Sequence, residues 1–160
     1  MLRRLPYFFL ILMMVSCDTR SVYSSFKSIN ESWKEGEKIE FNFEAPDSIN
    51  NYNLFLYVRN DENYAFSNLF LIVNMDFPDL TTITDTLQYE MAEPDGTWLG
   101  DGFTATKESK LWYKENIIFP VNGEYKVHVE HAMRINGKVE GIKALQGIND
   151  IGFKVESAKN

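Results

Sequence analysis

The chain has 160 residues, which is enough for one domain with a single hydrophobic core. It carries 23 Asp and Glu against 16 Lys and Arg, and its basic residues are not clustered. This charge pattern argues against nucleic-acid binding, because a phosphate backbone needs a basic surface. Aromatic residues make up 14% of the chain, a composition that favours β-strands.

The first 16 residues have the organisation of a bacterial secretory signal peptide. Two arginines precede an apolar run over residues 7–15, which is shorter than the about 20 residues that span a bilayer. Residues 14–17 (MVSC) resemble a lipobox, and Cys17 is the only cysteine. We therefore predict cleavage after residue 16, lipidation of Cys17 and anchoring in a membrane through several acyl chains. The alternatives are an ordinary signal peptide with a chance cysteine, or an uncleaved anchor.

Residues 17–36 are expected to connect the lipidated cysteine to the folded domain. Serine and charged residues dominate this segment, whereas Phe26, Ile29 and Trp33 are spaced as on one face of a helix. We expect an irregular tether that can include one short helix, followed by the folded domain over residues 37–160.

From residue 37 onward, the polarity pattern has a period of two, which is typical of β-strands. Strands are predicted over residues 38–45, 51–60, 66–77, 82–91, 111–119, 123–135 and 150–156, with 141–146 ambiguous. In 51–60 both alternating sets contain apolar side chains, so we expect both faces of this strand to be covered. Turn sequences separate about eight strands and no long helical pattern occurs. The prediction is an all-β single-domain β-sandwich, of jelly-roll or immunoglobulin-like type.

The two histidines of the chain do not form a metal or catalytic pair. His128 and His131 are three residues apart on a predicted strand, so their side chains point to opposite faces. His131 falls on the apolar face and is predicted to be a core residue, whereas His128 is predicted to be exposed. A converging ligand set, a phosphate loop and a serine nucleophile elbow are all missing from the sequence. We therefore predict no metal site, no cofactor and no enzymatic activity.

The turn-rich segment 92–109 holds one candidate ligand site. Trp98 lies between Asp95 and Asp101, each of which is followed by glycine, and Glu93 is close in sequence. An aromatic ring beside acidic groups can bind a sugar, and two carboxylates can support weak glycan hydrolysis. The alternative is that the Asp-Gly pairs only form turns and that Trp98 belongs to the core.

Ser48 and Thr86 are candidate modification sites. They occur in the sequences DSI and DTL, which resemble the short acceptor pattern for O-glycosylation of envelope proteins in Bacteroidetes. The pattern is permissive, and the alternative is that Ser48 belongs to a turn and Thr86 to a strand.

Several blocks of residues resemble one bacterial family. The lipobox is followed by 63–70 (NYAFSNLF), 95–102 (DGTWLGDG), 119–125 (FPVNGEY), 133–134 (MR) and 145–153 (LQGINDIGF). In this order and spacing they are similar to the gliding-motility lipoproteins of Bacteroidetes called GldH. The resemblance covers essentially the whole chain.

The resemblance implies an envelope lipoprotein that is required for gliding and tied to the type IX secretion machinery, with other envelope proteins as partners. It implies no enzyme activity and transfers no catalytic residue. The matching motifs are expected to maintain the fold, with Tyr125 in an arrangement that resembles a tyrosine corner. Residues 18–21 (DTRS) lack the acidic run that resembles the surface-export signal of that phylum. We therefore expect an outer-membrane lipoprotein that faces the periplasm.

Overall fold

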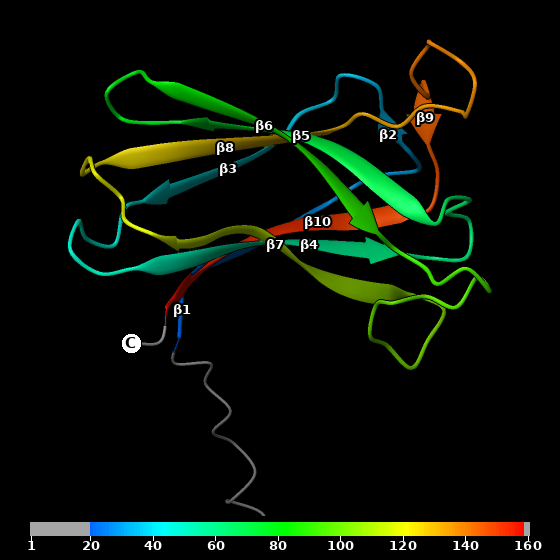
Figure 1. Cartoon of the computed structure of the whole chain (residues 1–160), viewed down its shortest axis with the longest axis horizontal. Coiled ribbons are helices and arrows are strands. Elements are labelled where there is room, and N and C mark those ends of the chain that lie inside the picture. The colour runs from blue at the N-terminus through cyan, green and yellow to red at the C-terminus, as the bar shows by residue number, and fades with distance from the viewer. Residues whose placement is uncertain (1–19, 159–160) are drawn as a thin grey trace, which may run out of the picture.

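The computed structural model of the protein describes residues 20–158, and the predicted signal peptide and Cys17 lie outside this range (Figure 1). The described residues form ten β-strands and no helix: β1 (Ser21–Ser28), β2 (Trp33–Lys34), β3 (Ile39–Glu44), β4 (Tyr52–Asn60), β5 (Asn68–Asp76), β6 (Thr82–Glu90), β7 (Lys107–Ile117), β8 (Glu124–His131), β9 (Ala144–Leu145) and β10 (Ile148–Ser157).

Two four-stranded sheets lie face to face, as the lower and upper layers of Figure 1. The first, here called the β10 sheet, has the strand order β1-β10-β4-β7, and the second, the β8 sheet, has the order β3-β8-β5-β6. All pairings are antiparallel, and β2 pairs with β9 at one end of the sandwich. The predicted all-β sandwich is confirmed.

The pairings are nested around the hairpin formed by β5 and β6. Moving outward from this hairpin, β4 pairs with β7, β3 with β8, and β1 with β10. The chain is thus one long antiparallel hairpin that is rolled into two sheets, which is the jelly-roll arrangement. Of the two predicted sandwich types, the immunoglobulin-like one is therefore wrong.

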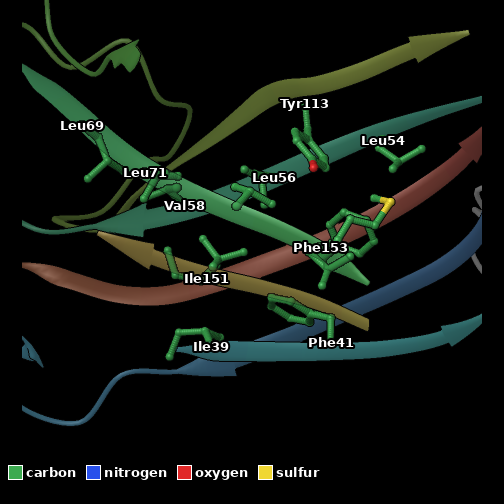
Figure 2. Packing of buried hydrophobic residues seen from close by; sticks show 14 of the residues in the cluster. Ile39, Phe41, Leu54, Leu56, Val58, Leu69, Leu71, Tyr113, Ile151 and Phe153 are labelled. Carbon is green, nitrogen blue, oxygen red and sulfur yellow. The ribbon is translucent and has the colours of Figure 1, made fainter. Parts of the chain in front are cut away.

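The core consists of the side chains that alternate toward the space between the sheets. β5, for example, alternates strictly between partly exposed and buried residues along its length. Figure 2 shows Ile39 and Phe41 of β3 close to Ile151 and Phe153 of β10, and the rings of Phe41 and Phe153 are 5.9 Å apart. Each fully buried side chain of this kind contributes about 1.5–3 kcal/mol to stability.

The expected short helix within residues 18–36 is wrong, and part of the expected tether is folded. β1 pairs along its length with β10, and the ring of Tyr23 lies 5.3 Å from that of Phe43 in the opposite sheet. The helix-like spacing of Phe26 and Trp33 instead spans two separate strands. The cause is that β1 is an edge strand rich in serine, so its apolar alternation is weak.

Candidate functional site

The loop before Trp98 is a tight turn that is closed by backbone hydrogen bonds. The N–H of Glu93 donates to the carbonyl of Thr97 at 2.8 Å, and Ala92 forms an isolated β-bridge with Trp98. The carboxylate of Asp95 accepts the N–H of Thr97 at 2.9 Å, and this bond holds the pKa of Asp95 below its usual value. Asp95 therefore has a structural role as a turn former.

Trp98 is partly buried and packs against the core cluster, with its ring 6.2 Å from that of Tyr64. Asp101 exchanges two backbone hydrogen bonds of 2.8 Å with Glu108 at the start of β7. The side chains of Glu93, Asp95 and Asp101 are exposed. The loop thus carries three exposed carboxylates and an indole that packs on the core. Asp95 is also accounted for by the turn that it forms, and Asp101 by its β-bridge to Glu108.

His131 is a buried core residue, as predicted. Its Nε2 lies 3.1 Å from the carbonyl oxygen of Trp33, which assigns the ring proton to Nε2, and burial lowers its pKa. The expected exposure of His128 is only partly correct, because its ring lies between carboxylates of β3 and β5 and its Nε2 is 3.1 Å from Asp76. Within residues 20–158, no three His, Cys, Asp or Glu side chains are grouped so as to hold a metal ion.

The two candidate glycosylation residues are both exposed. Ser48 lies in the loop between β3 and β4, and Thr86 lies in the middle of β6, an edge strand of the β8 sheet. An exposed hydroxyl at either position is accessible to a modifying enzyme, and both residues also fit the turn and strand roles considered from the sequence.

The outer face of the β10 sheet carries an aromatic cluster that sequence reasoning did not single out as a site. The ring of Phe26 on β1 lies over Gly152, where a Cβ atom would come within 2.6 Å of it. The guanidinium of Arg59 is 4.4 Å from the centre of this ring, and the ring of Tyr57 is 5.6 Å away. Arg59 is further paired with Glu108 at 2.6 Å, so its charge is neutralised on this face.

A second aromatic pair continues this outer face toward β7. The rings of Phe55 and Trp112 are 4.4 Å apart, and the ammonium of Lys110 is 3.9 Å from the centre of the Phe55 ring. Phe55 is buried by these neighbours, whereas Trp112 is about half exposed. The apolar residues on both parities of 51–60 were the sequence signal, and the expected covering of both faces is confirmed.

The outer face of the β8 sheet contains an open groove of about 630 Å³ near the end of β8. Its apolar lining comes from Phe66, Phe70 and Ile135, and Arg134 supplies a positive charge. Figure 1 places this end of the β8 sheet beside the loop that connects β8 to β9. Such a groove can accommodate side chains of a partner protein.

No helix among residues 20–158 has the length and hydrophobicity needed to cross a membrane.

Comparison with known proteins gives consistent matches. A family model described as GldH lipoprotein matches residues 21–155. The gliding motility lipoprotein GldH homolog of Christiangramia forsetii is 47% identical over 154 residues, which cover 96% of this chain and 94% of the relative. The gliding motility lipoprotein GldH of Flavobacterium johnsoniae is 46% identical over 145 residues, covering 91% and 90%.

Among solved structures, a 4-O-methyl-alpha-glucuronidase with specificity for decorated arabinogalactans aligns with 91% of this chain. This chain spans only 19% of that enzyme, with 11% identity and a TM-score of 0.42.

Proposed function

This chain belongs to the GldH lipoprotein family, and from that membership we propose that it is a lipid-anchored envelope protein of the gliding-motility machinery. The observation that carries the proposal is the extent of the match. The matched residues 21–155 include every strand of the described fold except the last two residues of β10. The gliding role is tested by deleting the gene from its own organism. Colony spreading should be lost and should return with the wild-type gene, whereas normal spreading of the deletion strain would contradict the proposal.

The anchor is proposed to be a lipid on Cys17. The lipobox over residues 14–17 and the absence of any second cysteine in the sequence support this assignment. Cys17→Ala should abolish lipidation and move the protein out of the detergent phase when detergent and water are separated. Unchanged partitioning of the variant would rule out Cys17 as the anchor.

The molecular role is proposed to be that of a non-enzymatic adaptor, linked to type IX secretion, on the periplasmic side of the outer membrane. The family resemblance supports the secretion link, and the lack of an acidic run in residues 18–21 supports the periplasmic orientation. Fractionation of the two membranes and protease treatment of intact cells test this location. Recovery in the inner membrane, or digestion from outside, would contradict it.

Two surfaces are available for the partner, and they can be compared directly. A photo-crosslinking amino acid at Ile135 samples the groove on the β8 sheet, and one at Trp112 samples the aromatic face of the β10 sheet. Both residues are exposed and lie outside the buried cluster between the sheets. Capture of a gliding or secretion component at one position identifies the partner surface. Failure at both positions, in cells that still glide, would contradict an adaptor role for these faces.

The second candidate function is glycan binding centred on Trp98. It is supported by the exposed carboxylates of Glu93, Asp95 and Asp101 in the same loop. Tryptophan fluorescence is titrated with peptidoglycan fragments and polysaccharides in wild type and in Trp98→Phe. A saturable change in fluorescence that occurs in the wild type and is absent from Trp98→Phe favours this function. Formation of cleaved glycan products in the same mixture would identify a weak hydrolase.

O-glycosylation is proposed at Ser48 and Thr86, because both sequences match the acceptor pattern and both side chains are exposed. Mass spectrometry of the two peptides, with Ser48→Ala and Thr86→Ala as controls, tests each site separately. Peptides of unmodified mass from the native host would exclude the modification.

A further inference from the structure

The distance between the proposed lipid and the folded domain is very short. β1 begins at Ser21, which is four residues after Cys17. Four fully extended residues reach at most about 14 Å. By contrast, the ten residues of β10 extend about 30 Å along the sandwich. A chain that is anchored through Cys17 therefore holds one particular end of the sandwich close to the bilayer.

The hydrogen bonds around Arg20 identify this end. The carbonyl of Arg20 accepts the N–H of Ser157, and the carbonyl of Asn51 accepts the N–H of Ala158, both at 2.9 Å. The start of β1 thus lies beside the end of β10 and the loop between β3 and β4, residues 45–51. In Figure 1 this loop is the cyan one, on the same side of the molecule as the end marked C.

The loop between β7 and β8, residues 118–123, lies against the β3–β4 loop. The N–H of Ala45 donates to the carbonyl of Gly123 at 3.0 Å, and the side chain of Asn51 donates to that of Asn116 at 2.9 Å. The two loops and the start of β1 therefore form one continuous end of the domain, which we call the anchor end.

Exposed branched apolar side chains lie on all three segments of the anchor end. The exposed fraction is 81% for Ile49 in the first loop, 48% for Ile118 in the second and 46% for Val22 in β1. Each is an isolated exposed residue in sequence, but the fold brings the three segments that carry them together.

The loop that carries Ile49 is held in place by Asp47. Its carboxylate accepts the N–H groups of Ile49 at 2.8 Å and Asn50 at 2.7 Å, and the hydroxyl of Tyr52 at 2.5 Å. The hydrogen bond from the backbone of Asn50 is the largest of the effects that hold the pKa of Asp47 far below its usual value. The loop is thus built around an ionised carboxylate, and Ile49 projects from a fixed turn.

We propose that the anchor end contacts the bilayer that holds the Cys17 lipid, and that Val22, Ile49 and Ile118 are the side chains that reach its surface. This inference rests on the proposed lipidation of Cys17. The exposed carboxylates of Glu44 and Glu124, which face each other across β3 and β8, disfavour a deeper approach to an anionic surface. The contact is therefore confined to the loop tips and the start of β1, and the rest of both outer sheet faces stays free for partner proteins.

The orientation can be measured on the full lipoprotein, purified from cells and reconstituted into phosphatidylethanolamine and phosphatidylglycerol vesicles. Because lipidation consumes the thiol of Cys17, one introduced cysteine is the only free thiol that can take a fluorescent label. Ile49→Cys samples the anchor end. Val139→Cys is the matched control, because it has the same exposed fraction of 81% but lies in the β8–β9 loop at the opposite end. Ser28→Cys samples the outer face of the β10 sheet at the far end of β1.

Brominated lipids should quench the label at position 49 and leave the labels at 139 and 28 unquenched. Equal quenching at position 28 would mean that the domain lies flat on its sheet, and quenching at 139 or at no position would likewise overturn the proposed orientation. Wild-type protein serves as a separate control, since labelling of its own Cys17 would show that the thiol is free. That result would refute the proposed anchor itself, independently of the orientation.

Discussion

At the scale of single residues, Gly147 is the glycine at which the structure tolerates an added side chain least. Its φ is +80°, and an added Cβ atom would lie 2.0 Å from the backbone nitrogen of Tyr64. We expect Gly147→Ala to lower the free energy of unfolding by at least about 3 kcal/mol. The left-handed conformation alone costs about 1–2 kcal/mol, and the overlap of the new Cβ atom with the backbone of Tyr64 adds to this cost. Chemical denaturation provides the measurement.

Gly36 is the matched control for this substitution. Its φ is +74°, but an added Cβ atom would have no neighbour within 4 Å. Gly36→Ala should therefore show only the conformational cost of about 1–2 kcal/mol. Equal losses of unfolding free energy in the two variants would mean that the close approach of Gly147 to the β4–β5 loop adds nothing to the cost of the substitution.

Tyr125 makes the contact expected from its resemblance to a tyrosine corner. Its hydroxyl donates to the carbonyl of Val121 at 2.9 Å, and its ring is stacked on that of Phe43 at 5.7 Å. Tyr125→Phe keeps the ring but removes the hydrogen bond, so we expect a loss of about 1 kcal/mol in the free energy of unfolding. Urea denaturation of the two proteins measures the difference, and an unchanged midpoint would show that the bond does not stabilise the turn.

His131 should make the stability of the protein depend on pH. Burial lowers its pKa in the folded state, so the unfolded chain, with an ordinary pKa of about 6.5, binds a proton first as the pH falls. This contribution to stability is present above pH of about 6.5 and is lost as the pH falls toward the folded pKa. We expect the unfolding free energy to decline as the pH falls below about 6.5, and to decline less in His131→Gln. Parallel curves for the two proteins would contradict this role.

At the scale of elements, alternation of polar and apolar residues predicted the strands from residue 37 onward, because one face of each strand must enter the core. The ends were less accurate, since β7 begins at Lys107 rather than near residue 111 and β8 ends at His131. β1 was missed because an edge strand needs few apolar residues. The pairing of β1 with β10 could not be predicted, because it joins segments more than a hundred residues apart and depends on the whole fold.

The contacts of the candidate site residues were likewise only partly predictable from the sequence. The sequence identified Trp98 and its acidic neighbours, but not the packing of this indole on the core beside Tyr64. It also indicated that β4 is covered on both faces. The partner that covers Phe55 is Trp112, from a strand that lies far away in sequence. Contacts between distant segments are thus the part of the site that patterns along the chain do not contain.

The contribution of β1 to the fold can be tested at Tyr23. This ring packs between the sheets against Phe43 and Phe153, at 5.3 and 6.2 Å. Tyr23→Ala should lower the free energy of unfolding by about 2–4 kcal/mol, as expected when a large packed side chain is removed. Ser24→Ala, on the exposed face of the same strand, is the control and should have little effect. If both variants were equally stable, the segment would behave as a tether.

At the scale of the whole molecule, the nested strand order brings the two ends of the described chain together. β1 and β10 are the outermost pair, so Arg20 and Ala158 lie at the same end of the sandwich. This arrangement places the segment leading to Cys17 at one defined point of the surface. The proposed lipid on Cys17 would hold the domain at this point and leave its sheet faces accessible, as the proposed adaptor role requires.

The chemical state of Cys17 in the mature protein decides whether the domain is held at the membrane by a lipid. Mass spectrometry of the N-terminal peptide, from protein purified out of the native envelope, measures this state directly. We expect a peptide that begins at Cys17 and carries the mass of several acyl chains. A mature N-terminus that begins with any unmodified residue would contradict the lipid anchor and the membrane-facing orientation derived from it.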